Sequence, residues 1–327
     1  MPTASYPYAY GCIRSLETSL INSAKLERMM AASNADDMLR ALMDMGYGRG
    51  SSVESVYDYE TLIDAELSKT FDAVHKMTPQ AKVTNLFFLK YDYQNLKVLL
   101  KNRILNQDGD DQLVEYGTVP VKDLKNAVYN NDCAKLPTEM KAVVLACKDS
   151  SDAVSIGYLA DKALYKQISR ELANIDDKNV IKYWETQADY FNVITVFRAR
   201  ALNDISLIEK SYLELGNVRL KNMLAAFDKS DDEAAKFIGT PNLDAGILSG
   251  LEYFVANKSL SVLEKNKDNY FIKLFKPLSY NQFSNAPIMG YLLAKVQEAN
   301  VVRLMMVAKI NNLPQKLVEE RLRDLYE

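Results

Sequence analysis

Asp92-Tyr93-Gln94-Asn95-Leu96 returns 97 residues later as Asp189-Tyr190-Phe191-Asn192-Val193, and a weaker copy stands at Gln297-Glu298-Ala299-Asn300-Val301. The likeness extends without a gap when Leu62–Leu105 is laid over Leu159–Leu202. The matched pairs include Leu62 with Leu159, Asp64 with Asp161, Leu67 with Leu164, Lys69 with Lys166 and Arg103 with Arg200. A constant offset over about forty positions indicates internal repetition, so we predict three copies of a unit of about one hundred residues.

Apolar residues recur at the spacing of one helix face through most of the chain. Leu96, Leu99, Leu100 and Ile104 form one such stripe, and Val193, Val196, Phe197 and Ala201 form its counterpart in the second copy. Only 12 glycines and 9 prolines interrupt the chain, and stretches such as 46–50 and 239–241 are predicted helix ends. Alternating β-branched strands with hairpin turns are missing. The chain is therefore predicted to be an all-α protein.

Short polar runs follow the first two copies of the repeated motif. One is Asn106–Asp111 and the other is Asn203–Ser206. A second likeness, between Leu124–Val128 and Leu220–Leu224, lies near the start of the second and third units. We predict helical repeat units at 1–112, 113–206 and 207–327.

The third unit departs from the other two. Its last long helix is expected to follow Pro277 and Pro287, and proline breaks helix interiors, so the approach to that helix is expected to differ. An offset of 108 aligns Asn300 with Asn192, whereas an offset of 109 aligns Glu298 with Asp189 and Lys309 with Arg200. Both offsets remain open, and the offset of 109 is favoured because it keeps the charge pattern.

Composition argues against several classes of partner. The 40 basic and 43 acidic residues leave a formal net charge of −3, which supplies no broad attraction for nucleic acid. Cys12, Cys133 and Cys147 lack the spacing of a zinc site or disulfide framework, and we expect reduced thiols in a cytosolic protein. No apolar run is long enough to span a bilayer, and the start of the chain lacks the pattern of a secretory signal.

Known catalytic motifs are missing from the sequence. His75 is the only histidine, so a site built from several histidines is impossible and His75 is expected to be structural or superficial. Neither G-x-x-x-x-G-K-[ST] nor G-x-G-x-x-G is present to bind a nucleotide. We therefore predict no catalytic residues, no cofactor or metal site, and no direct nucleotide binding or ATP hydrolysis.

The repeated Asp92/Asn95 and Asp189/Asn192 pairs place two polar side chains on one helix face. Such pairs are compatible with a metal or acid–base role. The flanking tyrosines and aliphatic stripes favour a structural role instead, in which the pairs hydrogen-bond or cap neighbouring helices.

Tyrosine is abundant at the start of the chain, where Tyr6, Tyr8 and Tyr10 fall within the first ten residues. Tyrosine suits protein–protein interfaces because it combines apolar area with a hydrogen-bonding group. Core packing is the favoured interpretation.

Three segments, read together, resemble the C subunit of the rotary V-type and archaeal-type ATPases, which is related to the eukaryotic d subunit. Residues 6–17 are similar to the family's opening Y-x-Y-x-x-A-R-[IV]-R-x-L-E, with Gly11 and Cys12 in place of the expected alanine and arginine. Residues 91–101 resemble its D-x-x-N-L-K helix. Residues 286–303 match its E-x-x-N-[ILV]-R in part, through Glu298, Val302 and Arg303, and the segments 309–314 and 320–323 resemble its closing helices.

The resemblance implies a funnel of three similar helical domains with pseudo-threefold symmetry. It implies a non-catalytic coupling subunit, a socket between the central shaft of subunits D and F and the proteolipid ring, on the cytoplasmic side of the membrane. Such a protein transmits torque for proton or sodium transport, or for ATP synthesis. The positions expected to matter structurally are Asp92, Asn95, Asp189, Asn192, Glu298 and Arg303.

Two alternatives differ from this interpretation. A soluble helical-repeat scaffold or adaptor is one, but solenoid repeats are about 20–45 residues, far shorter than these units. An all-helical enzyme with dispersed acidic ligands is the other. It would need clustered carboxylates, and the Asp/Asn helices supply at most one in each unit.

Overall fold

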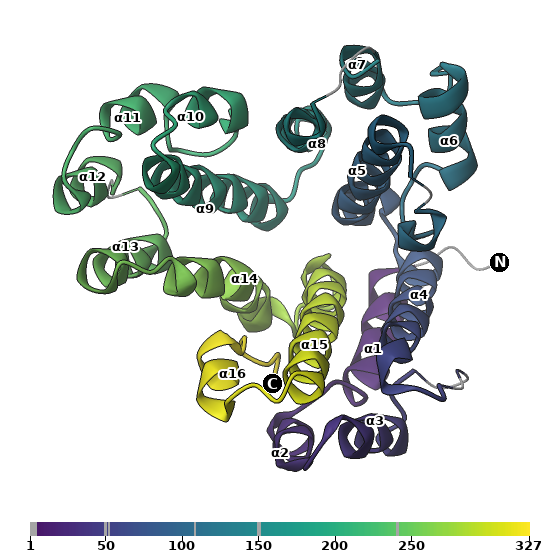
Figure 1. Ribbon diagram of the computed structural model, residues 1–327. Coiled ribbons are helices and arrows are strands. Elements are labelled where there is room, and N and C mark those ends of the chain that lie inside the picture. The colour runs from purple at the N-terminus through teal and green to yellow at the C-terminus, as the bar shows by residue number, and fades with distance from the viewer. Residues whose placement is uncertain (1–4, 49–50, 52, 108, 149–151, 240–241) are drawn as a thin grey trace. The chain divides into compact units, whose positions relative to one another are not determined.

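The computed structural model describes residues 5–48, 51, 53–107, 109–148, 152–239 and 242–327 (Figure 1). Helices and connecting turns account for all of this part of the chain, and it contains no strand. The prediction of an all-α protein is confirmed. The chain divides into two compact units. Unit 1 consists of Met1–Ala81 and Asp268–Glu327, and unit 2 is Lys82–Lys267. The predicted division into three repeat units, and their arrangement as a funnel, stay predictions.

Unit 1 joins the two ends of the sequence. Its α-helices are α1 Tyr6–Glu17, α2 Ser23–Ala31, α3 Ala35–Asp44, α4 Tyr59–Met77, α15 Ala286–Ile310 and α16 Gln315–Arg321, with the short 3₁₀ helices η1 Val56–Asp58 and η3 Lys276–Leu278. Helix α15 packs against α1, α3 and α4 (Figure 1). Most of its side chains are buried. A helix that is apolar on all sides is stable only in such a position.

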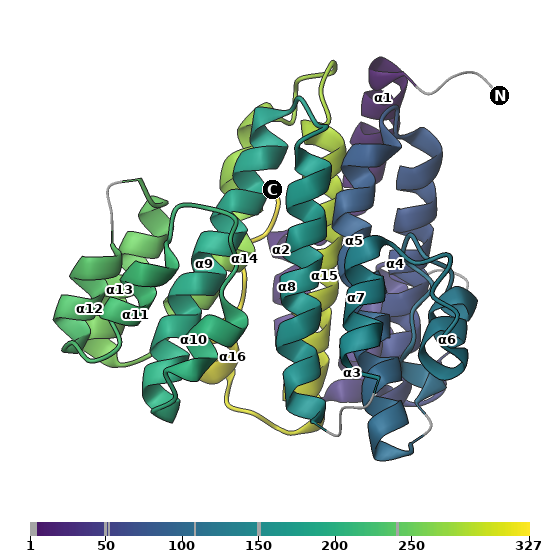
Figure 2. The same cartoon turned by 90° about the horizontal axis from the view of Figure 1, so that it is seen from above.

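Unit 2 holds the other two long helices. Its helices are α5 Ala81–Leu105, which begins at the unit boundary, α6 Val121–Asn130, α7 Thr138–Ala146, α8 Ala153–Leu172, α9 Lys178–Leu202, α10 Ser206–Ser211, α11 Leu220–Ala225, α12 Asp231–Ile238 and α13 Ala245–Asn257, with η2 Asp110–Gln112. Helix α14, Ser261–Phe275, crosses the boundary between the units. Figure 2 shows α7 beside α8, and these helices are packed together.

An aromatic cluster fills the core of unit 2 where α5, α8 and α9 meet. The ring of Phe87 lies 5.4 Å from that of Tyr183 and 5.3 Å from that of Trp184. Tyr165 meets Trp184 edge to face at 6.1 Å. Buried aromatic pairs in these geometries stabilise beyond the area that they remove from water.

The helix ends follow the sequence signals. Asn22 and Asn34 accept hydrogen bonds from the amides of Lys25 and Asp37 and so cap α2 and α3. Pro287 lies in the first turn of α15, where the ring removes no helical hydrogen bond. Helices α3 and α12 end just before the glycine-containing stretches that were expected to stop them, although residues 49–50 and 240–241 of those stretches lie outside the described residues.

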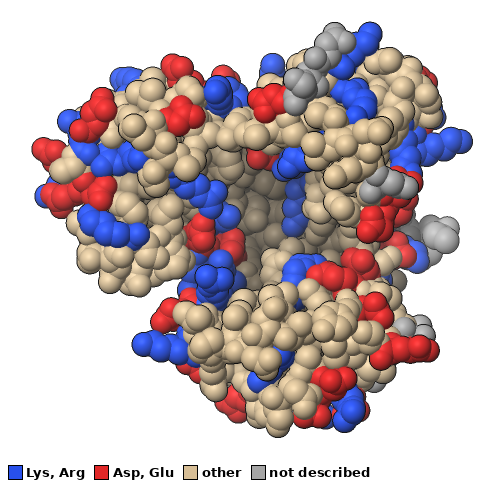
Figure 3. Space-filling model, viewed as in Figure 1, with Lys and Arg blue, Asp and Glu red and all other residues tan. Residues whose placement is uncertain are grey.

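The surface is of mixed charge. On the face drawn in Figure 3, basic and acidic side chains are intermixed with uncharged areas. This pattern fits the near balance of 40 basic and 43 acidic residues. No helix of the described residues is both long and apolar enough to cross a membrane.

Truncating Phe88 tests the core of unit 2. The side chain is 0% exposed on α5, so Phe88→Ala leaves a cavity and should lower the free energy of unfolding by about 4 kcal/mol. Val154, on α8, is 68% exposed, and Val154→Ala should change it by less than about 0.5 kcal/mol. Urea unfolding followed by circular dichroism compares the two. Equal losses of stability in the two variants would show that Phe88 does not lie in the core.

Candidate functional site

Asp92 and Asn95 on α5 hold the chain that leads into α6. The Asn95 side chain forms a pair of hydrogen bonds with one residue, donating to the carbonyl of Val114 at 2.7 Å and accepting from its amide at 3.0 Å. Asp92 accepts from the amides of Thr118 and Val119, both at 2.9 Å, and from the Thr118 hydroxyl at 2.7 Å. Both side chains are buried. They replace the water that the loop backbone loses on folding.

Asp189 and Asn192 repeat this arrangement on α9. Asn192 donates to the carbonyl of Leu213 at 2.9 Å and accepts from its amide at 3.0 Å. Asp189 accepts from the amides of Asn217 and Val218 at 2.6 and 2.8 Å. The two copies therefore use the same side-chain groups for the same purpose, which is to fix the segment before the next helix.

The electrostatics of the two aspartates agree as well. Burial raises the pKa of Asp92 above its ordinary value, although the hydrogen bonds from Val119 and Thr118 act in the opposite direction. Burial raises the pKa of Asp189 likewise, against the hydrogen bonds from Val218 and Asn217. Every partner in these hydrogen bonds is a backbone amide or a neutral side chain. The carboxylates bind protein backbone, and this geometry is that of an anchor.

A glycine completes each anchor, and sequence reasoning missed it. A Cβ on Gly117 would overlap the carboxylate of Asp92, and a Cβ on Gly216 would overlap that of Asp189. Gly216 also has φ +92°, in the region that favours glycine. The signal was present in the repeat, because Val114-Glu115-Tyr116-Gly117-Thr118-Val119 matches Leu213-Glu214-Leu215-Gly216-Asn217-Val218.

The third copy uses different groups for the same task. Glu298 on α15 accepts a hydrogen bond at 2.5 Å from the amide of Ile21, which precedes α2. Val301 is buried and Asn300 is exposed. The position of the asparagine is therefore taken by Val301, and the burial pattern follows the offset of 109.

A second anchor, nearer the end of each long helix, follows the same offset. Arg103 donates to the carbonyls of Val128 at 3.0 Å and Cys147 at 2.6 Å. Lys309 donates to the carbonyls of Met30 at 2.9 Å and Ala32 at 2.6 Å. Both cations satisfy carbonyls at helix ends, which have no partner within their own helix.

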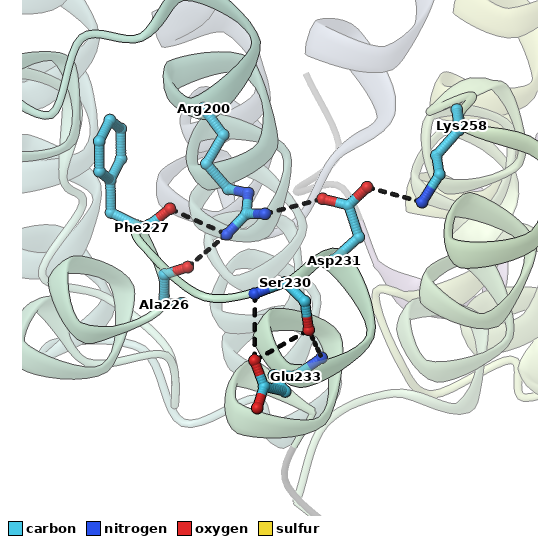
Figure 4. Close-up of polar contacts among 7 residues, drawn as sticks. All are labelled: Arg200, Ala226, Phe227, Ser230, Asp231, Glu233 and Lys258. Carbon is cyan, nitrogen blue, oxygen red and sulfur yellow. Dashed lines mark hydrogen bonds and ion pairs between the residues drawn. The ribbon is translucent and has the colours of Figure 1, made fainter.

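Arg200 is the corresponding cation of α9, and Figure 4 shows its surroundings. It donates to the carbonyls of Ala226 at 2.6 Å and Phe227 at 2.9 Å, and to Asp231 at 2.8 Å. Asp231 also accepts from Lys258 at 2.7 Å. Beside this network, Ser230 and Glu233 form a capping box that starts α12. The network ties the end of α9 to the starts and ends of three shorter helices.

Glu298 also belongs to a buried ionic cluster. Lys295 lies 2.5 Å from Glu298 and 2.7 Å from Glu66 of α4, and its side chain is 1% exposed. Burial lowers the pKa of Lys295, but the two carboxylates outweigh this effect and raise it. Burial raises the pKa of Glu298, against the effect of Lys295. Breaking such a cluster leaves an uncompensated buried charge, which costs about 3–5 kcal/mol.

The remaining candidates do not join a common site. Arg303 forms a half-exposed pair with Glu60 at 2.7 Å and belongs to none of the anchors. His75 lies near the end of α4, and partial burial lowers its pKa. Cys12, Cys133 and Cys147 are free thiols. Among the described residues, no group of histidine, cysteine, aspartate and glutamate side chains could hold a metal ion.

The tyrosines of α1 differ in exposure. Tyr8 is exposed, while Tyr6 and Tyr10 are partly buried. The hydroxyl of Tyr6 donates to Asn285 at 3.3 Å. Tyr10 lies against the guanidinium of Arg14, at 5.5 Å from the ring centre. Tyr6 therefore helps to attach α1 within unit 1, whereas Tyr10 contacts a residue of its own helix.

Comparison with known proteins gives matches along nearly the whole chain. The family model of the ATP synthase (C/AC39) subunit matches residues 9–321. The C subunit of the V-type sodium ATPase of Enterococcus hirae is 21% identical over 322 residues, which cover 96% of this chain and 97% of that protein. The C subunit of the A-type ATP synthase of Methanocaldococcus jannaschii is 23% identical, with 95% and 84% covered, and that of Thermococcus kodakarensis is 22% identical, with 96% and 89% covered. These matches confirm the resemblance drawn from the sequence.

Replacing Gly216 tests the anchor of α9. Gly216→Ala should lower the free energy of unfolding by about 2 kcal/mol, because the new Cβ meets Asp189 and the backbone is strained. Gly157, within α8, has no atom within 4 Å of the place that a Cβ would take, so Gly157→Ala should stabilise by up to about 1 kcal/mol. Urea titrations of both variants measure the difference. A neutral Gly216→Ala would mean that the carboxylate does not approach the loop.

Asp231 gives the Arg200 network a pH dependence. Lys258 and Arg200 hold the pKa of Asp231 below its ordinary value. The ionised carboxylate therefore stabilises the folded protein at any pH above the pKa that Asp231 has in the unfolded chain. This stabilisation is lost as the pH falls through the pKa of Asp231 in the folded protein. Asp231→Asn should therefore lower the unfolding free energy by about 1 kcal/mol near neutral pH, since Lys258 is largely exposed, and by much less near about pH 3.

The control for this experiment is Asp232→Asn, next along α12. Within the described residues Asp232 forms an ion pair with Lys236 alone, and both side chains are exposed. That variant should change stability by less than about 0.5 kcal/mol at either pH. A loss for Asp231→Asn that is the same at both pH values would contradict the assignment.

Proposed function

Because this chain belongs to the ATP synthase (C/AC39) subunit family, we propose that it is the non-catalytic coupling subunit of a rotary V-type or A-type ATPase. In this role it is a socket that joins the central shaft of subunits D and F to the proteolipid ring. It transmits torque and binds no nucleotide. It lies on the cytoplasmic side of the membrane as a peripheral part of the complex, and the ion transported is a proton or sodium.

The observation that carries the proposal is the family match over residues 9–321. Relatives from a bacterium and from archaea, all C subunits, cover at least 95% of the chain, so the likeness belongs to the whole protein and not to one helix motif. The alternative of a scaffold unrelated to rotary ATPases has no comparable support.

The anchors are suited to a part that transmits force. In each long helix, buried polar side chains fix the backbone of a neighbouring segment through hydrogen bonds to defined residues. Breaking one of these hydrogen bonds leaves a buried polar group without a partner, which costs free energy, so small displacements of the segment from its helix are opposed. Close packing of the helices adds to this stiffness, because protein interiors have low compressibility.

Reconstitution tests the function. The purified protein should bind both the D–F shaft and the proteolipid ring, and a complex assembled without it should hydrolyse ATP without moving ions. Adding the protein back should restore ion transport into vesicles, measured together with ATP hydrolysis. Full coupling in the complex that lacks this protein would refute the proposal.

A further inference from the structure

An open groove in unit 2 is not used by the anchors described above. Helices α7 and α8 form one wall and the floor, and the segment 212–215 after α10 forms the other wall. The groove encloses about 650 Å³.

Apolar side chains line much of the groove, and two of them are exposed to solvent. Ala142 of α7 is exposed, and Leu159 of α8 is 38% exposed. Val143, Ala163 and Leu215 extend the apolar lining. Contiguous exposed apolar surface in a folded protein often marks an interaction site.

The wall at 212–215 has little free backbone to offer a partner strand. The amide and carbonyl of Leu213 are both held by Asn192, and the amide of Tyr212 donates to the carbonyl of Ile208. Addition of a strand needs unpaired backbone groups, so recognition in this groove must use side chains. The floor runs from Leu159 to Arg170 along α8, about 17 Å at 1.5 Å per residue, which matches about three turns of a partner helix.

Two lysines of the groove have no ion pair among the described residues, and Lys166 is the more exposed of them. Arg170 is neutralised by Glu139, through hydrogen bonds of 2.9 and 2.8 Å, and by Glu171. Lys162 donates to the carbonyl of Glu209 at 3.2 Å. Lys166 lies between them on the same helix face, is exposed, and has no ion pair within the part of the chain that the structure describes. Glu214, on the opposite wall, is exposed as well.

We propose that this groove binds an amphipathic helix from another subunit of the rotary complex. Apolar side chains of that helix pack on Ala142, Leu159 and Ala163, and an acidic side chain pairs with Lys166. The inference rests on the proposed function, since the partner is taken from the same complex. It adds the location of one contact and the chemistry that the partner must present.

Photo-cross-linking in the assembled complex tests the groove directly. A benzophenone amino acid in place of Ala142 should cross-link to one helix of a rotary subunit, with an acidic residue within one turn of the cross-linked position by mass spectrometry. Ala142 is exposed, so the probe does not disturb the core. An intact complex without a cross-link from this position would overturn the groove proposal and leave the proposed function standing. Failure of the wild-type protein to assemble with any rotary subunit would overturn both.

Charge reversal supplies a second measurement with purified subunits. Lys166→Glu should weaken binding of the cross-linked partner about tenfold, and a Glu→Lys or Asp→Lys change in the partner helix should restore it. Lys141→Glu, an exposed change on α7 outside the groove, should leave the affinity unchanged. Equal affinities for wild type and Lys166→Glu would refute the pairing of Lys166 with the partner. Circular dichroism verifies that both variants keep the helical fold.

Discussion

The buried hydrogen bonds between each long helix and a neighbouring segment of backbone are the constraint on which the rest of the structure depends. Asn95 and Asn192 each satisfy both the amide and the carbonyl of a single residue, Val114 or Leu213. Without them these backbone groups would be buried and unpaired, at a cost of about 1–3 kcal/mol each.

The third long helix shows that the constraint is physical and does not require one residue type. Glu298 reaches the amide of Ile21 across 277 residues of sequence, and Lys309 replaces the arginine of the other copies. Both contacts join α15 to the N-terminal part of the chain within unit 1. The hydroxyl of Ser23, at the start of α2, also donates to the carboxylate of Glu327 at 2.7 Å. The third copy of the motif thus joins the last long helix to the N-terminal helices.

Sequence reasoning reached the fold class, because helical periodicity is a local property. It did not reach the partners of the Asp/Asn pairs. Val114 and Leu213 contribute backbone atoms, which leave no trace in a side-chain pattern. Gly117 and Gly216 could have been found by extending the repeat beyond the long helices. The partner of Glu298, Ile21, could not have been found from the sequence. Its amide is distant from Glu298 in sequence, and any residue except proline supplies the same donor.

The same distinction separates the anchors from the groove. An anchor is closed, because every polar atom of Asn192 that faces the loop has a partner. The same loop segment, 212–215, forms one wall of the groove, where Lys166 and Glu214 are exposed beside apolar surface. Because Asn192 fixes the backbone of Leu213, this wall is rigid, which lowers the entropy cost of binding to it. The Asn192 anchor, which stabilises the fold, can in this way also hold the groove wall at 212–215 in place for binding.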